Sequence, residues 1–565
     1  VFADGGELPA QWDINSDSVA GWQEFELSGL AAMPDATFTS GGFVEPTVTV
    51  ENLPQDPDND SPYDGATGVM TVWQKVQADA LWLHTETLAS TAEDLDLFVG
   101  RDTNGDGQAQ ESEELCSSTS PTEIEFCDLF TPVAGNYWIL VQNWTATNAT
   151  DEVTLKSAVV GKDTESRLAV TGEGIIPAAA SHKVRLSWDN VNVVPGAEMI
   201  GAVGIGTSRE QANNIGIIPV TFTKTGVEAP ETIVLMSGVK RGLTLAGSGM
   251  HDRSFIDVPT GASALTISAT GADGTQSENL KIELYRVPFD DAFESAPFAD
   301  APDMGGAPLY SDSGAGGAGP VVTVPEAELN PGRWFAVLKN SSGENAAVEI
   351  QADVTFSGDS VPLRAGLWEA SSRTNLRQGF DYTTTGGYRA FLWYTYDEDG
   401  APTWYQAAAP EPDGNIWVAE LLRYTNDGTL QQATPVGHVS ITSLAEQDAI
   451  FSFVLFGENG SDREFPSLPP VCPTVDDVER TYNGVWSRAA VGVGGATVVV
   501  NATSQAFVHY IYDEQGNPMW LIGSPDPQSA AAEEMSLLQF GGYCAVCAQE
   551  EITIESVGSF TRVFM

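Results

Sequence analysis

The residues with the clearest chemistry form one acidic loop, Asp102-Thr-Asn-Gly-Asp-Gly-Gln-Ala-Gln-Glu-Ser-Glu113. A calcium loop of twelve residues places oxygen ligands at positions 1, 3, 5, 7, 9 and 12, with glycine at position 6. Gly107 takes the sixth position, and Glu113 supplies the bidentate carboxylate at the twelfth. Calcium accepts this flexible oxygen cage, whereas magnesium demands a tighter octahedron. The pattern therefore predicts a calcium site formed by Asp102, Asn104, Asp106, Gln108, Gln110 and Glu113.

A solvated acidic turn is the alternative interpretation of this loop, since the chain holds 78 Asp and Glu. The six ligand positions and the glycine at position 6 all occur in register, which favours a bound ion over a solvated turn. The strand-like segment Leu95–Val99 precedes the loop where a sensor would have a long helix, so we expect a structural ion. Asp94 and Asp96 lie on that strand. They are either part of a second ion site or exposed strand-edge carboxylates, and the pattern leaves both open.

The five cysteines suit a large secreted protein with few disulfides. Cys116 and Cys127, just past the acidic loop, are predicted to form one. Cys544-Ala-Val-Cys547 has the spacing of a redox or zinc half-site, but no second such pair accompanies it. A bridge between Cys544 and Cys547, or from Cys472 to either, is the favoured interpretation.

Catalysis is not predicted for this chain. Its five histidines, His84, His182, His251, His438 and His509, are scattered, without a His-x-x-x-His pair. No Gly-x-Ser-x-Gly elbow occurs, and Gly206-Thr-Ser-Arg209 reads as a loop.

Aromatic residues crowd an internal repeat in which Phe391–Tyr405 matches Phe507–Leu521. Each copy reads as a β-hairpin with aromatic residues on both arms. Because successive strand residues face opposite ways, these rings cannot all enter one core. They either fill the interior of a thin repeat, contact another subunit or stack on sugar rings; the candidates for stacking are Trp393, Tyr396, Trp404 and Trp520.

The elements that carry these residues are predicted to be strands. Alternating segments such as Val69–Val76, Lys183–Trp188 and Thr497–Asn501 are punctuated by 56 Gly and 32 Pro, which indicates an all-β protein of tandem sandwiches. A net charge of −53 excludes nucleic acid as a partner. No apolar run is long enough to span a bilayer, and we expect any signal peptide to have been removed before Val1.

A chain of 565 residues requires several domains. A second, fainter repeat matches Asp94–Phe98 and Pro132–Asn143 to Asn279–Tyr285 and Pro331–Asn340, and we interpret it as two copies of one sandwich. Asn279 and Lys281 replace the acids, so the second copy is expected to bind no calcium. The predicted units are an N-terminal segment 1–40, sandwiches at 41–160, 161–226 and 227–358, and aromatic repeats at 359–470 and 471–565, of which the last is interpreted as truncated.

The Asp94-Leu-Asp-Leu-Phe98 strand, the acidic loop and Gly135-Asn-Tyr-Trp-Ile-Leu-Val141 resemble a bacterial pre-peptidase C-terminal (PPC) domain, a calcium-binding β-sandwich. The domain order, with a fibronectin-like block around Val184–Phe222, is similar to the tail of secreted subtilisin-like serine peptidases of Gram-negative bacteria. This resemblance implies a secreted, cell-surface location and a catalytic domain elsewhere.

Three functions follow as expectations. The first is a non-catalytic extracellular scaffold, stabilised by calcium, that adheres to a cell surface or polysaccharide or self-associates into a fibre-like component. The second is the cleaved accessory region of a secreted peptidase. The third is a carbohydrate-binding module that uses the C-terminal aromatic residues.

Overall fold

A computed structural model describes residues 7–57, 61–65, 67–161, 167–178, 181–229, 231–294, 306–358, 360–361, 363–370, 379–426, 431–466, 474–475, 478–479, 484–487, 494–500, 505–525, 534–542 and 552–561. The predicted all-β class is confirmed, since sheets account for nearly all regular structure. Within these ranges the one α-helix is α1 (Phe289–Glu294), and no helix there has the length and apolar character to cross a membrane.

The first domain, here called the split sandwich, is built from two stretches of chain. One sheet has the order β1 (Trp12–Ser16), β15 (Gly216–Lys224), β14 (Glu198–Gly206) and β3 (Thr37–Val44). The facing sheet has the order β12 (Leu168–Thr171), β13 (His182–Trp188) and β2 (Gly21–Leu27).

This pairing corrects the predicted division into an N-terminal segment 1–40 and a separate block 161–226. β1 pairs in parallel with β15, and β2 pairs with β13. Trp12 and Leu27 enter the same core as Phe222. The later block alone lacks the strands needed to cover its apolar faces, and the earlier residues supply them.

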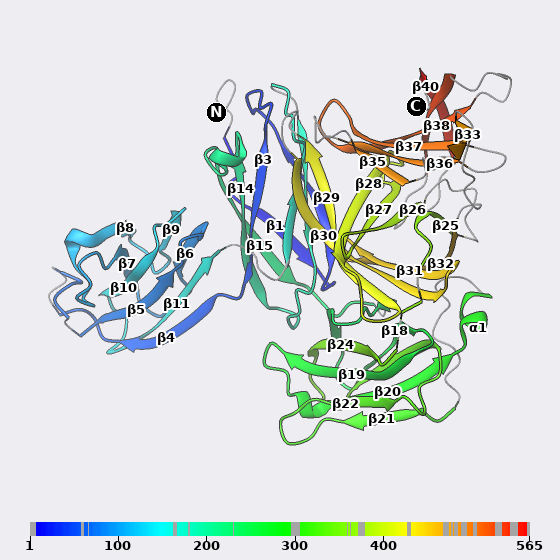
Figure 1. The fold of residues 1–565 in the computed structure, drawn as a ribbon. Helices are drawn as coiled ribbons and strands as arrows, with labels where there is room; N and C mark the ends of the chain where they lie inside the picture. The colour runs from blue at the N-terminus through cyan, green and yellow to red at the C-terminus, as the bar shows by residue number, and fades with distance from the viewer. Residues whose placement is uncertain are drawn as a thin grey trace.

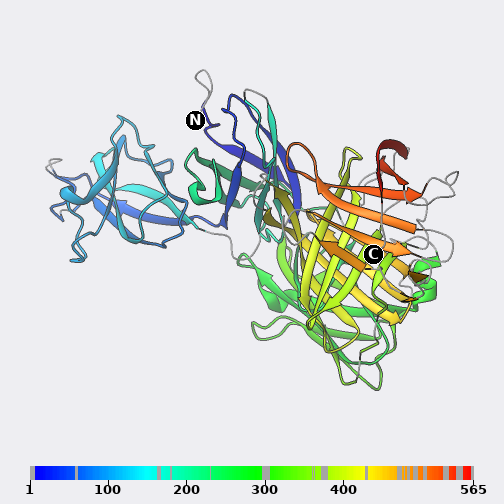
Figure 2. The same cartoon turned by 45° about the horizontal axis from the view of Figure 1, so that its top comes forward.

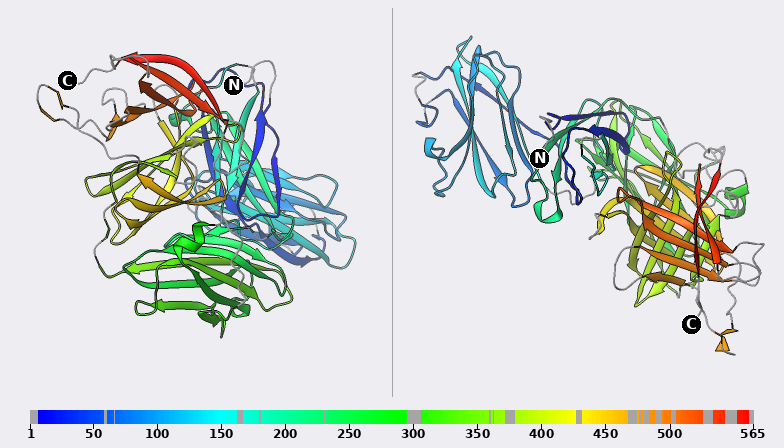
Figure 3. Two further views of the ribbon diagram at one scale, coloured as in Figure 1. Left: turned by 90° about the vertical axis from the view of Figure 1, so that its right-hand side faces the viewer. Right: turned by 90° about the horizontal axis from the view of Figure 1, so that it is seen from above.

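The projecting sandwich (residues 47–160) is inserted between those two stretches and stands away from the other domains (Figures 1 and 2). Its sheets have the orders β5 (Val69–Val76), β10 (Gly135–Thr145), β7 (Asp94–Arg101), β8 (Glu114–Ser118), and β4 (Thr47–Leu53), β11 (Asp151–Val160), β6 (Trp82–Thr87), β9 (Phe126–Phe130). The view from above separates it clearly from the rest (Figure 3). The projecting sandwich joins the split sandwich through an apolar contact, here called its root. In this contact Trp82 and Val160 pack with Ile200 and Ile217 of the split sandwich.

The second-copy sandwich (residues 233–356) repeats this topology. Its sheets have the orders β16 (Ile233–Val234), β18 (Met250–Val258), β23 (Gly332–Asn340), β20 (Leu280–Val287), β21 (Tyr310–Ser313), and β17 (Lys240–Leu245), β24 (Ala346–Phe356), β19 (Ala262–Ala272), β22 (Val321–Pro325). Apart from the added β16, each strand occupies the place of its counterpart in the projecting sandwich. The duplication predicted from the fainter repeat is confirmed.

The first aromatic repeat closes into an eight-stranded barrel, here called the aromatic barrel. Its strands follow in chain order: β25 (Gly366–Ala370), β26 (Gly379–Thr385), β27 (Tyr388–Tyr396), β28 (Pro402–Pro410), β29 (Ile416–Asn426), β30 (Gln431–Ala445), β31 (Asp448–Leu455) and β32 (Glu458–Pro466). Trp368, Phe391, Trp393 and Phe453 fill its interior.

The second aromatic repeat forms a six-stranded sheet, here called the open sheet, that lies beside the barrel (Figures 1 and 3). Its strands are β35 (Gly484–Ser487), β36 (Gly495–Val500), β37 (Gln505–Tyr512), β38 (Pro518–Pro525), β39 (Glu534–Gly541) and β40 (Thr553–Thr561). A short hairpin, β33 (Thr474–Val475) and β34 (Val478–Glu479), precedes it. Cys472, Cys544 and Cys547 lie outside the described residues, so their predicted bridges stay predictions.

Candidate functional site in the projecting sandwich

The acidic loop connects β7 to β8 at one end of the projecting sandwich. Gly105 and Gly107 have φ of 74° and 73°, a left-handed conformation that glycine adopts without steric cost. Gly107 therefore makes the sharp turn expected of the sixth position. The short 3-10 helix η1 (Glu111–Glu113) follows and carries Glu113 back toward the start of the loop.

Hydrogen bonds turn the polar side chains of the loop inward. Asp102 accepts the backbone N–H of Gly105 at 2.6 Å and that of Gly107 at 3.2 Å. Asp106 accepts the side-chain amides of Asn104 at 3.1 Å and Gln110 at 2.5 Å. The side chains at positions 1, 3, 5 and 9 thus converge on one small volume.

Glu113 closes the loop from its far end. Its Oε1 accepts the backbone N–H of Thr103 at 2.7 Å and of Asn104 at 3.2 Å, and its Oε2 accepts the indole N–H of Trp138 at 3.4 Å. Burial alone would raise the pKa of Glu113, but these hydrogen bonds hold it below its usual value. Gly100 makes room for the indole, because a Cβ there would lie 2.0 Å from the Trp138 ring.

The donor set fits calcium in its chemistry, with carboxylate and amide oxygens gathered at the predicted positions. Across the described chain, however, no group of three or more His, Cys, Asp or Glu side chains is arranged to hold a metal ion. In this structure Asp102 and Asp106 accept N–H groups of the loop, and Glu113 accepts N–H groups of Thr103, Asn104 and Trp138.

The predicted disulfide is present, with Cys116 bonded to Cys127 and a Cα–Cα distance of 6.1 Å. Cys116 belongs to β8 and Cys127 to β9, which lie in different sheets. The bridge therefore joins the two layers of the sandwich at the edge next to the acidic loop.

Asp94 and Asp96 lie on one face of β7, and the structure brings them into electrostatic contact with Glu125. Asp96 is 7% exposed. Burial, together with the charges of Asp94 and Glu125, raises its pKa to about 7. Burial and the charges of Glu125 and Glu93 also raise the pKa of Asp94. Asp96 is therefore not the exposed strand-edge carboxylate of the second interpretation, and a nearby cation would relieve this repulsion.

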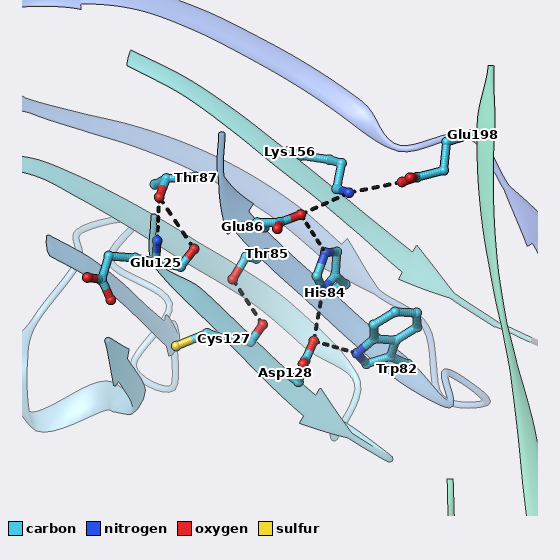
Figure 4. A network of polar contacts seen from close by, with 10 residues as sticks. All are labelled: Trp82, His84, Thr85, Glu86, Thr87, Glu125, Cys127, Asp128, Lys156 and Glu198. Atoms are coloured by element: carbon cyan, nitrogen blue, oxygen red, sulfur yellow. Dashed lines mark hydrogen bonds and ion pairs between the residues drawn. The ribbon is translucent and has the colours of Figure 1, made fainter. Parts of the chain in front are cut away.

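A polar network covers the face of β6 near the root of the projecting sandwich (Figure 4). His84 contacts Asp128 at 2.8 Å and Glu86 at 3.6 Å. Lys156 joins Glu86 to Glu198 of the split sandwich, both at 2.9 Å. The network thus ties the projecting sandwich to its neighbour through ionic contacts as well as through the apolar root.

We expect the stability of the projecting sandwich to fall as pH rises through the titration of His84. Burial lowers the pKa of this imidazole, but hydrogen bonds to Asp128 and Glu86 outweigh burial and raise it above its usual value. The protonated ring therefore stabilises the folded state below about pH 6.5, and that contribution is lost above the raised pKa. Melting at about pH 6 and about pH 8 should differ by roughly 3 °C in the wild type. His84→Gln should remove this part of the pH dependence, and an unchanged difference would contradict the assignment.

The four aromatic residues proposed for sugar stacking are all buried: Trp393 is 1% exposed, Tyr396 2%, Trp404 4% and Trp520 0%. Trp393 points into the barrel. The other three, on the barrel's outer surface and on the open sheet, pack together where the two repeats meet. The prediction of a stacking platform is wrong for these residues. One face of the barrel hairpin packs into the barrel interior, and the other packs into the apolar cluster between the two repeats.

Exposed apolar side chains gather instead on the projecting sandwich. It holds half of the exposed large apolar residues among those described, although it is about a fifth of the chain. Each of its four edge strands contributes at least one. They include Val48 and Val50 on β4, Trp73 on β5, Leu115 on β8, and Phe126 and Phe130 on β9.

A polar cavity of about 290 Å³ at the junction of the domains was not predicted. The turns at Asp397–Asp399 and at Asp513 line it together with β13. Arg185 forms ion pairs with Glu24 at 2.9 Å and with Glu398, and Arg423 donates to Asn517 at 3.0 Å. The repeated Asp-Glu-x-Gly turns were visible in the sequence, but nothing there indicated that both would line one cavity with Arg185 and Arg423.

No model of a known protein family matches this sequence, and no curated protein matches it. One similar solved structure is the crystal structure of CfaE, the adhesive subunit of the CFA/I fimbria of enterotoxigenic Escherichia coli. The two are 6% identical, the likeness covers 72% of this chain and 98% of that chain, and the TM-score is 0.12. A likeness at that level establishes neither a shared fold nor a shared function.

Proposed function

We propose that this chain is a non-catalytic, extracellular β scaffold that uses its projecting sandwich to adhere to a surface. The observation that carries the proposal is the concentration of exposed apolar side chains on the one domain that stands away from the others. Exposed sheet edges with apolar side chains can pair with an extended partner, and all four edge strands of this domain carry such side chains.

The other domains supply rigidity in this proposal. Apolar packing and the ion pair between Lys156 and Glu198 fix the root of the projecting sandwich. Arg333 bonds Asp257 and also Ser461 of the aromatic barrel. Contacts of this kind hold the domains in a fixed arrangement and keep the adhesive surface at a distance from the body.

A non-catalytic role is supported by the environments of His84 and His182. His84 bonds Asp128, and His182 bonds Glu173 at 2.7 Å and the Pro177 carbonyl at 3.2 Å. These partners are carboxylates and a backbone carbonyl, whereas a serine nucleophile needs its hydroxyl beside the imidazole.

Adhesion is tested with the full chain carrying Val48→Thr, Val50→Thr and Phe126→Ser together. These side chains are 54%, 52% and 61% exposed, so the variant should fold. We expect the wild type to be retained on intact bacterial cells and on phenyl-coated beads, and the triple variant to lose most of that retention. A control with Leu309→Ser and Val321→Thr, exposed on the second-copy sandwich, should be retained like the wild type. Equal retention of all three proteins would overturn the proposal.

We further propose that calcium occupies the acidic loop and stabilises the projecting sandwich. The inward-facing oxygens of Asp102 and Asp106 support this proposal, as does the turn at Gly107. Asp94 and Asp96 are proposed to bind a second cation beside Glu125, since their mutual repulsion would then be relieved.

Millimolar calcium should raise the melting temperature of the projecting sandwich relative to EDTA. An ion at 100 times its Kd adds about 2.7 kcal/mol to the free energy of unfolding, because it binds the folded state alone. Glu113→Gln should remove most of the increase, measured by calorimetry in both conditions. Glu111→Gln is the matched control, since Glu111 is an exposed carboxylate at a non-ligand position of the same loop. A wild type that melts at the same temperature with calcium and with EDTA would contradict the site.

A further inference from the structure

A buried carboxylate lies where the aromatic barrel meets the open sheet. Asp381 is on β26, directly opposite Leu367 of β25 and Leu392 of β27. Residues that lie opposite each other in paired strands share one face of the sheet. Because Leu367 and Leu392 pack in the apolar cluster between the two repeats, Asp381 also faces the open sheet.

Asp381 is buried without a charged partner. Its side chain is 1% exposed, and neither carboxylate oxygen meets a well-aligned hydrogen-bond donor in the described part of the chain. The Thr497 hydroxyl of β36 interacts with this carboxylate and lowers its pKa, but the same hydroxyl bonds that of Tyr510 at 2.6 Å. An ionised carboxylate in such a position has lost its hydration and gained no cation in return.

The titratable groups near Asp381 come from four strands, and none of those described is a base. They are Glu369 of β25, Tyr394 of β27, Glu464 of β32 and Tyr510 of β37. Burial raises the pKa of both tyrosines well above its usual value, so their hydroxyls stay neutral. β35 and β36, which also pack against this part of the barrel, contain no titratable residue. The surroundings therefore favour a neutral Asp381.

Burial raises the pKa of Asp381 to about 6 in the docked arrangement of the two repeats. In a separated arrangement the carboxylate would be hydrated, and its pKa would return to the ordinary value of about 3.9. The docked state thus binds the proton more tightly. Docking is strongest below about pH 3.9, weakens as pH rises from there to about 6, and changes no further above that pH.

The open sheet lies beside the barrel as a separate sheet (Figures 1 and 3). Among the described strands, none of one sheet pairs with a strand of the other. Besides the apolar cluster, isolated hydrogen bonds cross the interface. The Asn426 N–H donates to the Gly516 carbonyl, and the Gly542 N–H donates to the Gly400 carbonyl, both at 2.9 Å. Such an interface can open while the ladders of both sheets stay intact.

We propose that Asp381 is a pH-sensitive switch that controls the docking of the open sheet on the aromatic barrel. The protonated carboxyl can donate its O–H to the Thr497 oxygen, and the repeats stay docked. The ionised carboxylate is a buried charge without a partner, and the open sheet then separates more readily. Acid strengthens the interface, and neutral pH loosens it. This switch is separate from the adhesive role of the projecting sandwich and does not depend on calcium.

The test is hydrogen exchange of the full chain at pH 5 and pH 7.5, corrected for the intrinsic pH dependence of exchange. The amides of Asn426 and Gly542 report docking directly, because each donates across the interface. We expect their opening equilibrium constant to be roughly tenfold larger at pH 7.5 than at pH 5. The amides of β31, inside the barrel, should change by less than about twofold. Equal opening of Asn426 and Gly542 at both pH values would overturn the proposal.

Two variants identify the titrating group. Asp381→Asn keeps the shape of the side chain without its charge, and it should reduce the pH difference to less than about twofold. Asp381→Leu suits the apolar neighbours and should behave in the same way. Asp413→Asn, at an exposed carboxylate of the same barrel, is the matched control and should retain the roughly tenfold difference.

A pH difference that persists in both Asp381 variants would place the titrating group elsewhere and overturn the proposal, as would its loss in Asp413→Asn. None of these measurements uses retention on cells or beads, so failure here is distinct from failure of the adhesion test.

Discussion

Asp257→Ala is expected to destabilise the second-copy sandwich by roughly 3–5 kcal/mol, because it leaves a buried guanidinium without its carboxylate. Arg333 and Asp257 lie directly opposite each other on β23 and β18, and their side chains are each 3% exposed. Two hydrogen bonds of 2.9 Å join them. The Arg333 guanidinium also lies 3.8 Å from the centre of the Phe255 ring.

The expected loss of stability comes from leaving one buried charge without its partner. It does not measure the net contribution of the intact ion pair. The double change Arg333→Met and Asp257→Leu removes both charges and should recover most of the stability, since burying two ions carries its own desolvation cost. Calorimetric melting of the full chain measures all three proteins, with the exposed Glu326→Ala as a control on the same sandwich. A loss below about 1 kcal/mol for Asp257→Ala would mean that water reaches Arg333.

Trp520→Ala is expected to cost roughly 3–5 kcal/mol and to separate the open sheet from the aromatic barrel. The Trp520 side chain is 0% exposed, and its ring lies 5.6 Å from Tyr394 and 5.5 Å from Tyr396 of the barrel. Its indole N–H donates to the Thr395 carbonyl at 2.6 Å. One residue therefore supplies both the central apolar contact and a buried hydrogen bond between the two repeats.

Hydrogen exchange and limited proteolysis distinguish separation from general unfolding. The strands of the open sheet should lose protection in Trp520→Ala, while β27 and β31 inside the barrel keep theirs. Trp520→Phe retains an aromatic ring but loses the N–H that the Thr395 carbonyl accepts, and should cost about 1 kcal/mol for the lost hydrogen bond. Trp73→Ala, at a ring that is 41% exposed, should leave both repeats unchanged. Uniform loss of protection throughout the chain would show that the repeats do not fold separately.

Local chemistry accounts for what could be predicted at the candidate site. The turn at Gly107 and the inward-facing Asp102 and Asp106 follow from residue types within one loop, because glycine permits the turn and short acidic side chains bond nearby N–H groups. The disulfide between Cys116 and Cys127 was also predictable, since both follow the loop at close spacing. The contact of Glu125 with Asp94 and Asp96 was not, because it joins β7 to the loop just before β9.

The aromatic residues show where sequence periodicity reaches its limit. Because side chains alternate in direction along β27, the sequence placed Trp393 and Tyr394 on opposite faces of the sheet. It did not indicate that the outer face would be covered by the other repeat, where Tyr394 meets Trp520. Burial of an outward ring depends on a neighbour that no local pattern describes.

By itself, the sequence determined the all-β class, the acidic loop and the two internal duplications, since each depends on short-range periodicity, turn residues or direct self-similarity. Only the tertiary structure decided that β1 and β2 complete a sandwich with β15 and β13, and that the hairpin aromatic residues are buried between the repeats. The physical reason is that strand pairing and burial are set by partners far away in the chain. Several distant segments could cover the same apolar face, and only packing in three dimensions determines which segment does so.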